Sequence, residues 1–159
     1  MVWGLGERFP RLPDWNTVPT TSTTVWLEPT AFILGFNSPN INSIGVYSKD
    51  TAGPENGDNF TVLWAGDAAP NTSIVGFDLR YQKPGNSTWF AWQTNVQTTS
   101  ASFIMTADTT EFPDGIYTFQ VKAKDSAGQE GEYRTETQGT IIVDREAPWM
   151  TENQLYMPI

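Results

Sequence analysis

The sequence predicts an all-β protein, an antiparallel two-sheet sandwich. Several short segments alternate between apolar and polar residues, and this period of two is typical of strands with one buried and one solvated face. Clusters of Gly, Pro, Asn and Asp separate these segments about every 8–12 residues, a spacing typical of sandwiches. No segment shows the apolar period of an amphipathic helix, so the alternation decides the fold class.

The clearest strand is expected over residues 115–125. Tyr117, Phe119 and Val121 fall on one face of this segment, and polar residues fall on the other. A turn at 125–128 follows, and residues 139–144 give the last strand. We expect the remaining strands over 23–36, 42–48, 59–66, 74–82, 87–95 and 98–107, with 131–138 as a connection.

The apolar positions of these strands predict the core. Residues 31–34 form a continuous apolar run, which we expect to be buried as an additional or leading strand. In residues 74–82, Val75 is expected on the same face as Phe77 and Leu79. The expected core is Phe60, Val62, Trp64, Phe77, Leu79, Tyr81, Phe103, Tyr117, Phe119, Val121, Ile141 and Val143.

Composition excludes several classes of function. The net charge is −9, and the nine Lys and Arg residues form no run, which argues against nucleic acids and anionic membrane surfaces as partners. The chain has no His and no Cys, so His-based triads, Cys nucleophiles and His-based zinc sites are excluded. No apolar run approaches the roughly 20 residues of a membrane span, so we expect no membrane insertion.

The block from residue 60 to residue 148 resembles a fibronectin type III domain of bacterial or archaeal surface proteins and secreted enzymes. Trp64 matches the core Trp of the family's second strand. Tyr117 matches the Tyr of the sixth strand, whose hydroxyl closes a corner onto nearby backbone. Residues 143–148, Val-Asp-Arg-Glu-Ala-Pro, resemble the junction between successive modules. The resemblance implies seven strands in two antiparallel sheets with an immunoglobulin-like arrangement.

Domain boundaries follow from this comparison. We expect an N-terminal extended segment at 1–28, the fibronectin type III-like sandwich with extra N-terminal strands at 29–147, and a C-terminal tail or linker at 148–159. The first residues lack the basic segment and the long apolar run of a signal peptide, so we expect an excised or mature part of a larger protein. Low charge and plentiful Thr, Ser, Asn and Gln favour an extracellular or cell-surface location.

The implied arrangement gathers loops at two poles. Loops 67–73, 95–98 and 125–132 meet at one pole, and loops 49–58, 83–87 and 108–115 meet at the other, near Asp144. Calcium prefers such converging carboxylates, although turns also favour Asp for conformational reasons. No cofactor is otherwise expected. The candidate calcium ligands are Asp58, Asp108, Asp114 and Asp144.

Two tryptophans are candidate glycan ligands. Trp89 and Trp92 fall on opposite strand faces by parity, so one ring is expected to point outward, where a sugar face can stack on it. The alternative is that Trp92 fills the core and Trp89 covers a sheet face. Glu111 and Asp114 are better explained as surface acids than as a hydrolytic pair, so we expect no enzyme.

These features predict a non-catalytic adhesion or spacer module of a larger extracellular or cell-surface protein. Its expected partners are neighbouring modules of the same chain or another surface protein. The first alternative is a carbohydrate-binding accessory module of a secreted enzyme. The second is a subunit of a surface filament assembled by strand addition, with residues 31–36 as an open edge.

Overall fold

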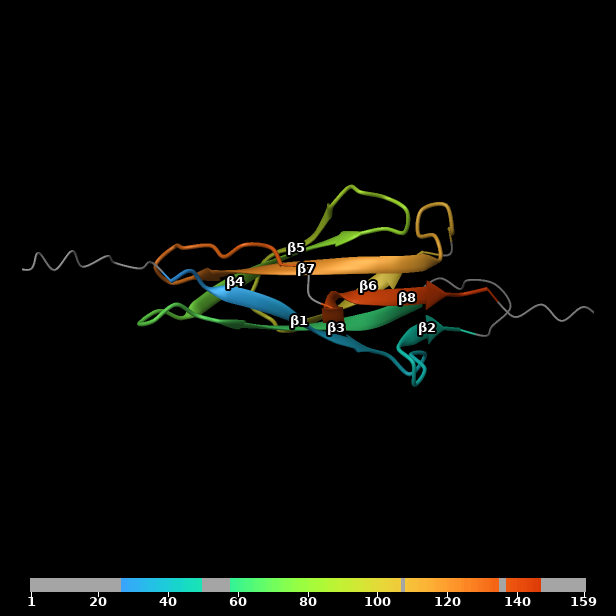
Figure 1. The fold of residues 1–159 in the computed structure, drawn as a ribbon, viewed down its shortest axis with the longest axis horizontal. Helices are drawn as coiled ribbons and strands as arrows, with labels where there is room; N and C mark the ends of the chain where they lie inside the picture. The colour runs from blue at the N-terminus through green and yellow to red at the C-terminus, as the bar shows by residue number, and fades with distance from the viewer. Residues whose placement is uncertain (1–26, 50–57, 107, 135–136, 147–159) are drawn as a thin grey trace, which may run out of the picture.

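The computed structural model describes residues 27–49, 58–106, 108–134 and 137–146, which form two packed β-sheets (Figure 1). A three-stranded sheet has the order β1-β3-β6, and a five-stranded sheet has the order β2-β8-β7-β4-β5. The elements are β1 (Thr30–Asn37), β2 (Val46–Ser48), β3 (Asp58–Asp67), β4 (Ile74–Gln82), β5 (Phe90–Val96), β6 (Ser100–Met105), β7 (Gly115–Asp125), the 3-10 helix η1 (Thr137–Gly139) and β8 (Thr140–Asp144).

The all-β, two-sheet prediction is confirmed, and each of the eight segments expected as strands contributes one. The purely antiparallel arrangement that the resemblance implied is wrong. The described chain has eight strands, and β2 pairs with β8 in parallel. The turn before β2 explains this parallel pairing. The Asn42 side-chain oxygen accepts hydrogen bonds from the backbone N–H groups of Ile44 and Val46, and Gly45 adopts a φ of 80°. This turn brings Val46–Ser48 beside β8.

The expected continuous burial of residues 31–34 is also wrong. Ala31 and Ile33 are buried, but Leu34 is 51% exposed and Phe32 is half-buried, so β1 alternates. Its pairing with β3 shifts register between Ile33 and Gly35. Because of this shift, Phe36 turns inward, and its ring centroid lies 5.5 Å from that of Phe119.

A second register shift corrects the predicted face of β4. The pairing of β4 with β7 shifts between Ile74 and Gly76. Ile74 therefore packs against the core in place of the expected Val75, while Phe77 and Leu79 are buried as predicted.

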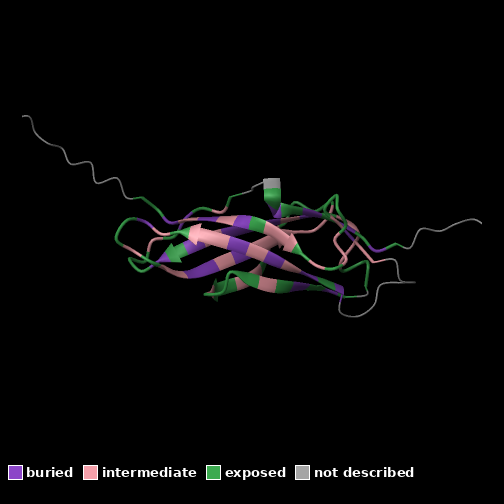
Figure 2. Ribbon diagram, turned by 90° about the horizontal axis from the view of Figure 1, so that it is seen from below, coloured by how far each residue is buried: buried purple, intermediate pink, exposed green. Residues whose placement is uncertain are grey.

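The predicted core is confirmed, with Tyr81 half-buried at its margin. Figure 2 shows buried positions alternating with less buried ones along the strands. Aromatic rings fill the space between the sheets: Phe103 of β6 and Phe119 of β7 have centroids 5.0 Å apart in an edge-to-face arrangement. Ala31, Ile33, Tyr47, Met105 and Ala123 complete the core.

Residues 130–134 are more than a connection. Glu130 forms an isolated bridge with Lys124, and Arg134 forms one with Val121. These bridges lie on the same side of β7 as its pairing with β8, which covers Gly115 to Thr118. The last strand of the sandwich is thus divided into two parts, with η1 between them.

The predicted gathering of loops is confirmed for the described pairs. At one pole, the Ser126 N–H donates to the Ser73 carbonyl oxygen at 2.9 Å. At the other, the Lys83 ammonium donates to the Glu111 carbonyl oxygen at 2.6 Å. Apart from Leu27 and Glu28, the expected N-terminal segment 1–28 lies outside the described residues, as does the expected tail 148–159.

Candidate functional site

The pole expected to hold calcium is organised by a buried arginine. Arg145 follows β8 directly, and its side chain is 1% exposed. Its backbone N–H donates to Asp114 Oδ2 at 2.7 Å, and its Nε donates to Asp114 Oδ1 at 2.9 Å. Both oxygens of this carboxylate are therefore engaged, so Asp114 accepts from Arg145 in two places.

The same guanidinium fastens the loop that precedes β7. Arg145 Nη1 donates to the Thr106 carbonyl oxygen at 2.9 Å, and Nη2 donates to the Phe112 carbonyl oxygen. These bonds join the end of the last described strand to residues 106–114. We call Arg145 with Thr106, Phe112 and Asp114 the Arg145 clasp. The clasp fixes the direction in which the chain leaves the sandwich.

The other candidate calcium ligands lie apart from the clasp. Asp58 is buried and accepts a hydrogen bond from the Lys49 ammonium at 2.8 Å. Asp108 closes its own turn by accepting from the backbone and hydroxyl of Thr110, and these bonds lower the pKa of its carboxyl. Asp144 is exposed.

A calcium site needs several carboxylates that converge, and the described residues contain no group of three or more side chains arranged to hold a metal ion. Asp58 and Asp114 each satisfy a cation of the protein itself, and Asp108 satisfies its own turn. Calcium binding by these four residues stays a prediction, because the described residues do not bring their carboxylates together around one point.

The two candidate tryptophans lie on opposite faces, as parity indicated. Trp92 points inward, with its ring centroid 5.5 Å from that of Phe103 and 5.6 Å from that of Phe119. Trp89 lies on the outer face of the five-stranded sheet, where the Arg80 guanidinium stacks 4.6 Å from its ring centroid. Trp92 therefore packs against the core and Trp89 faces outward, although both residues are partly buried.

Arg80 organises the outer face of this sheet. It lies 3.9 Å from the ring centroid of Tyr133 as well, so one guanidinium contacts two aromatic rings. Its Nε and Nη2 both donate to Gln120 Oε1, at 2.9 and 2.7 Å. We call Trp89, Arg80, Tyr133 and Gln120 the Arg80 ladder. It holds Tyr133, and with it residues 130–134, against β7 and β4.

Charged side chains border the ladder. Lys122 donates to Glu130 and lies 3.5 Å from an oxygen of Asp78. The hydrogen bond to Glu130 raises the pKa of Lys122, and the same bond lowers the pKa of Glu130. The local mixture of signs means that this face offers no uniformly charged surface to a ligand.

The tyrosine corner implied by the resemblance is present. The Tyr117 hydroxyl donates to the Pro113 carbonyl oxygen at 2.7 Å. Burial of the phenol raises the pKa of Tyr117 well above its ordinary range, and the positive charge of Arg145 opposes this effect only in part. The corner and the Arg145 clasp thus hold neighbouring parts of one loop.

Sequence reasoning did not identify Arg145, Arg80 or Tyr133. Two acceptors of Arg145 are backbone carbonyl oxygens more than thirty residues away. Because every residue has a backbone carbonyl, the residue type at these positions does not indicate the contact. Arg80 left a weak signal, because parity places it outward on β4 when Leu79 is inward. Tyr133 lay in a segment that was predicted only as a connection.

Neither known protein-family models nor curated proteins match this sequence. Within the part of the chain that the structure describes, no helix is long and apolar enough to cross a membrane.

Replacing Arg145 by Gln tests the clasp. The change leaves the Asp114 carboxylate and two carbonyl oxygens without their cationic donor, so we expect the free energy of unfolding to fall by about 3 kcal/mol. Lys83→Gln is the matched control, because Lys83 donates to the same loop from a more exposed position and should cost less than about 1 kcal/mol. Urea unfolding measures both. Equal losses of unfolding free energy in the two variants would contradict the role assigned to the Arg145 clasp.

Alkaline pH tests the tyrosine corner. The pKa of Tyr117 is raised on folding, so its contribution to stability is complete below the unfolded value of about 10 and is lost as pH rises above it. Tyr117→Phe should lower stability by about 1 kcal/mol near neutral pH. It should also reduce the further loss between about pH 9 and about pH 11, relative to the native chain. If the free energy of unfolding falls equally with pH in the native chain and in Tyr117→Phe, Tyr117 ionises in the folded protein as it does in the unfolded chain, and this account of the corner is wrong.

Proposed function

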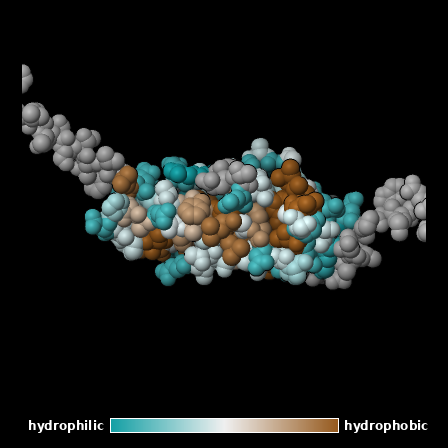
Figure 3. All heavy atoms as spheres, turned by 60° about the horizontal axis from the view of Figure 1, so that its bottom comes forward, coloured by the Kyte–Doolittle hydropathy of each residue, from teal (hydrophilic) through white to brown (hydrophobic). Residues whose placement is uncertain are grey.

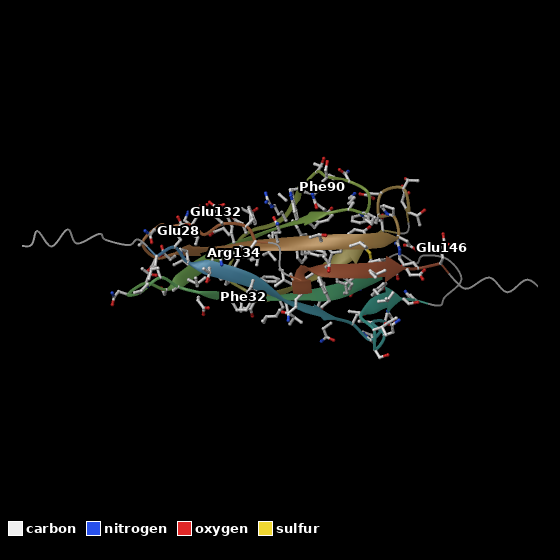
Figure 4. The ribbon with its side chains drawn as sticks, in the orientation of Figure 1. Glu28, Phe32, Phe90, Glu132, Arg134 and Glu146 are labelled. Atoms are coloured by element: carbon white, nitrogen blue, oxygen red, sulfur yellow. The ribbon has the colours of Figure 1, made fainter. Side chains whose placement is uncertain are left out.

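We propose that this chain is a non-catalytic spacer and interaction module of a larger extracellular or cell-surface protein. One observation carries the proposal. The described chain enters the sandwich at one end and leaves it at the other, as Glu28 and Glu146 mark in Figure 4. A unit with its ends at opposite poles extends a string of modules by its own length, whereas adjacent ends would fold the string back.

The Arg145 clasp supports the same role. A spacer positions its neighbour only if the chain leaves the module in a fixed direction. Arg145 is the next-to-last residue that the structure describes, and four hydrogen bonds hold it to the body of the sandwich. The clasp therefore supports a rigid exit.

Strand order supports the fibronectin type III-like part of the proposal. Sheets of the order β1-β3-β6 and β8-β7-β4-β5 have the connections of a seven-stranded immunoglobulin-like sandwich, with β2 as an additional strand beside β8. Trp64 lies fully buried in β3, and Tyr117 forms its corner at the start of β7. The bacterial or archaeal origin rests on the sequence resemblance alone.

Carbohydrate binding is the alternative function. The observation in its favour is that Trp89 is partly exposed on the outer face of the five-stranded sheet and is held in place by Arg80. Against it, one side of the ring already contacts the guanidinium. Quenching of tryptophan fluorescence by a polysaccharide, abolished by Trp89→Phe, would favour this alternative.

A tandem of two complete chains tests the spacer role by small-angle X-ray scattering. We expect the tandem to have close to twice the maximum dimension of the single chain, because each module adds its full length. Arg145→Gln in the first copy should broaden the distance distribution, and Lys83→Gln in the same copy should leave it unchanged. A compact tandem, little longer than the single chain, would contradict the proposal.

A further inference from the structure

Edge strands in this protein carry no charge, which is the reverse of the usual pattern. Residues 29–48 and 84–107 contain no Asp, Glu, Lys or Arg, although the chain has a net charge of −9. These two stretches supply β1, β2, β5 and β6, which are the four edges of the two sheets. Proteins usually place charges, Pro or irregularities on edges, because an open edge pairs with other strands.

Three of these edges are protected by other means. The pairing of β1 with β3 shifts register at Gly35, and Gly131 lies so close to the start of β1 that a Cβ on it would be 2.0 Å from the Pro29 carbonyl oxygen. β2 has three residues. The pairing of β5 with β4 contains two register shifts, and Asn95 in β5 has a φ of 52°. Irregular or very short edges are poor templates for another strand.

The β6 edge has none of these protections. It pairs with β3 from Ser100 to Met105 without a register shift. Within the described residues, its opposite side pairs with no strand. Ser102 and Ile104 point away from the core, and Ile104 is 61% exposed. Other hydrophobic side chains also reach the surface in separate places, as the scattered brown areas of Figure 3 show. Ile104 differs from them because it lies on a strand with a regular open edge.

We propose that β6 of one chain pairs antiparallel with β6 of a second copy about a twofold axis, so that the two three-stranded sheets become continuous. A twofold contact requires a patch that complements itself, and an antiparallel strand pair meets this requirement. An uncharged strand suits a twofold contact, because near the axis each charged side chain would meet its own copy. The net charge of −9 on each copy opposes association, and the neutral edge is the place where this repulsion is least. The proposal is independent of the spacer role.

This assignment moves the strand-addition site that the sequence suggested. Residues 31–36 were expected as the open edge of the alternative filament function. The register shift and the nearby Gly131 make β1 the weaker template, and a single self-complementary β6 contact closes a dimer instead of extending a filament.

Sedimentation velocity with two matched lysine variants tests the dimer. Asn37, Thr61 and Ser102 form one row across the three-stranded sheet, so Asn37 and Ser102 occupy equivalent exposed positions at its two edges. Ser102→Lys places like charges near the twofold axis and should raise the dimer dissociation constant about tenfold or more. Asn37→Lys adds the same charge to the other edge and should leave that constant unchanged.

Crosslinking gives a second readout that does not depend on affinity. The chain has no Cys, so Ser102→Cys introduces a single thiol. Under mild oxidation we expect a disulfide-linked dimer from Ser102→Cys and none above background from Asn37→Cys. A native chain that sediments only as a monomer at millimolar concentration would overturn the proposal. Equal weakening by the two lysine variants would also overturn it, because it would place the contact on the outer face of the sheet.

Discussion

The contact between Phe103 and Phe119 joins the two sheets, and much of the structure depends on it. Phe103 belongs to the three-stranded sheet and Phe119 to the five-stranded sheet, and their centroids are 5.0 Å apart. Each ring also contacts Tyr81 and Trp92. Because the chain has no disulfide to link its layers, burial of these rings is the main source of attraction between them. The alternation along β6 and β7 follows from the need to point these side chains inward.

Local patterns predicted much of the fold. The bounds of β4 at Ile74–Gln82 and of β7 at Gly115–Asp125 agree with the sequence, because period-two alternation is a property of the segment itself. The burial of Trp64 also followed from the alternation of its segment, whereas the corner of Tyr117 was implied by the family resemblance. The register shifts near Gly35 and Gly76 were not predicted, since they depend on how a strand meets its neighbour.

The candidate site was predicted less well, for a physical reason. Sequence reasoning found the carboxylates of one pole, but their partners decide what they do. Asp114 and Asp58 neutralise Arg145 and Lys49, which are cations of the same chain. The spacing of acids in a sequence does not reveal whether a carboxylate faces a metal or a distant arginine. Parity correctly placed Trp89 and Trp92 on opposite faces, but it could not indicate that Arg80 would stack on the outer ring.

The distribution of charge connects the fold with the two proposals. Charged residues occupy the inner strands and the poles, where Arg145 and Arg80 fasten loops onto the sheets. The edge strands are left neutral. The first arrangement gives a module with a fixed exit, and the second gives a regular edge at β6 where another copy can pair. Both require that the sandwich itself be rigid, and that rigidity depends on the aromatic contact between its layers.

A double-mutant cycle on Phe103→Leu and Phe119→Leu tests that claim most directly. Each single change should lower the free energy of unfolding by about 1–3 kcal/mol, and the two should couple by about 1 kcal/mol, since either one removes the same contact. A control cycle pairs Phe103→Leu with Trp89→Phe on the outer face, where the effects should add. Additive losses for Phe103 and Phe119 would contradict the account, because the two rings would then stabilise their sheets independently.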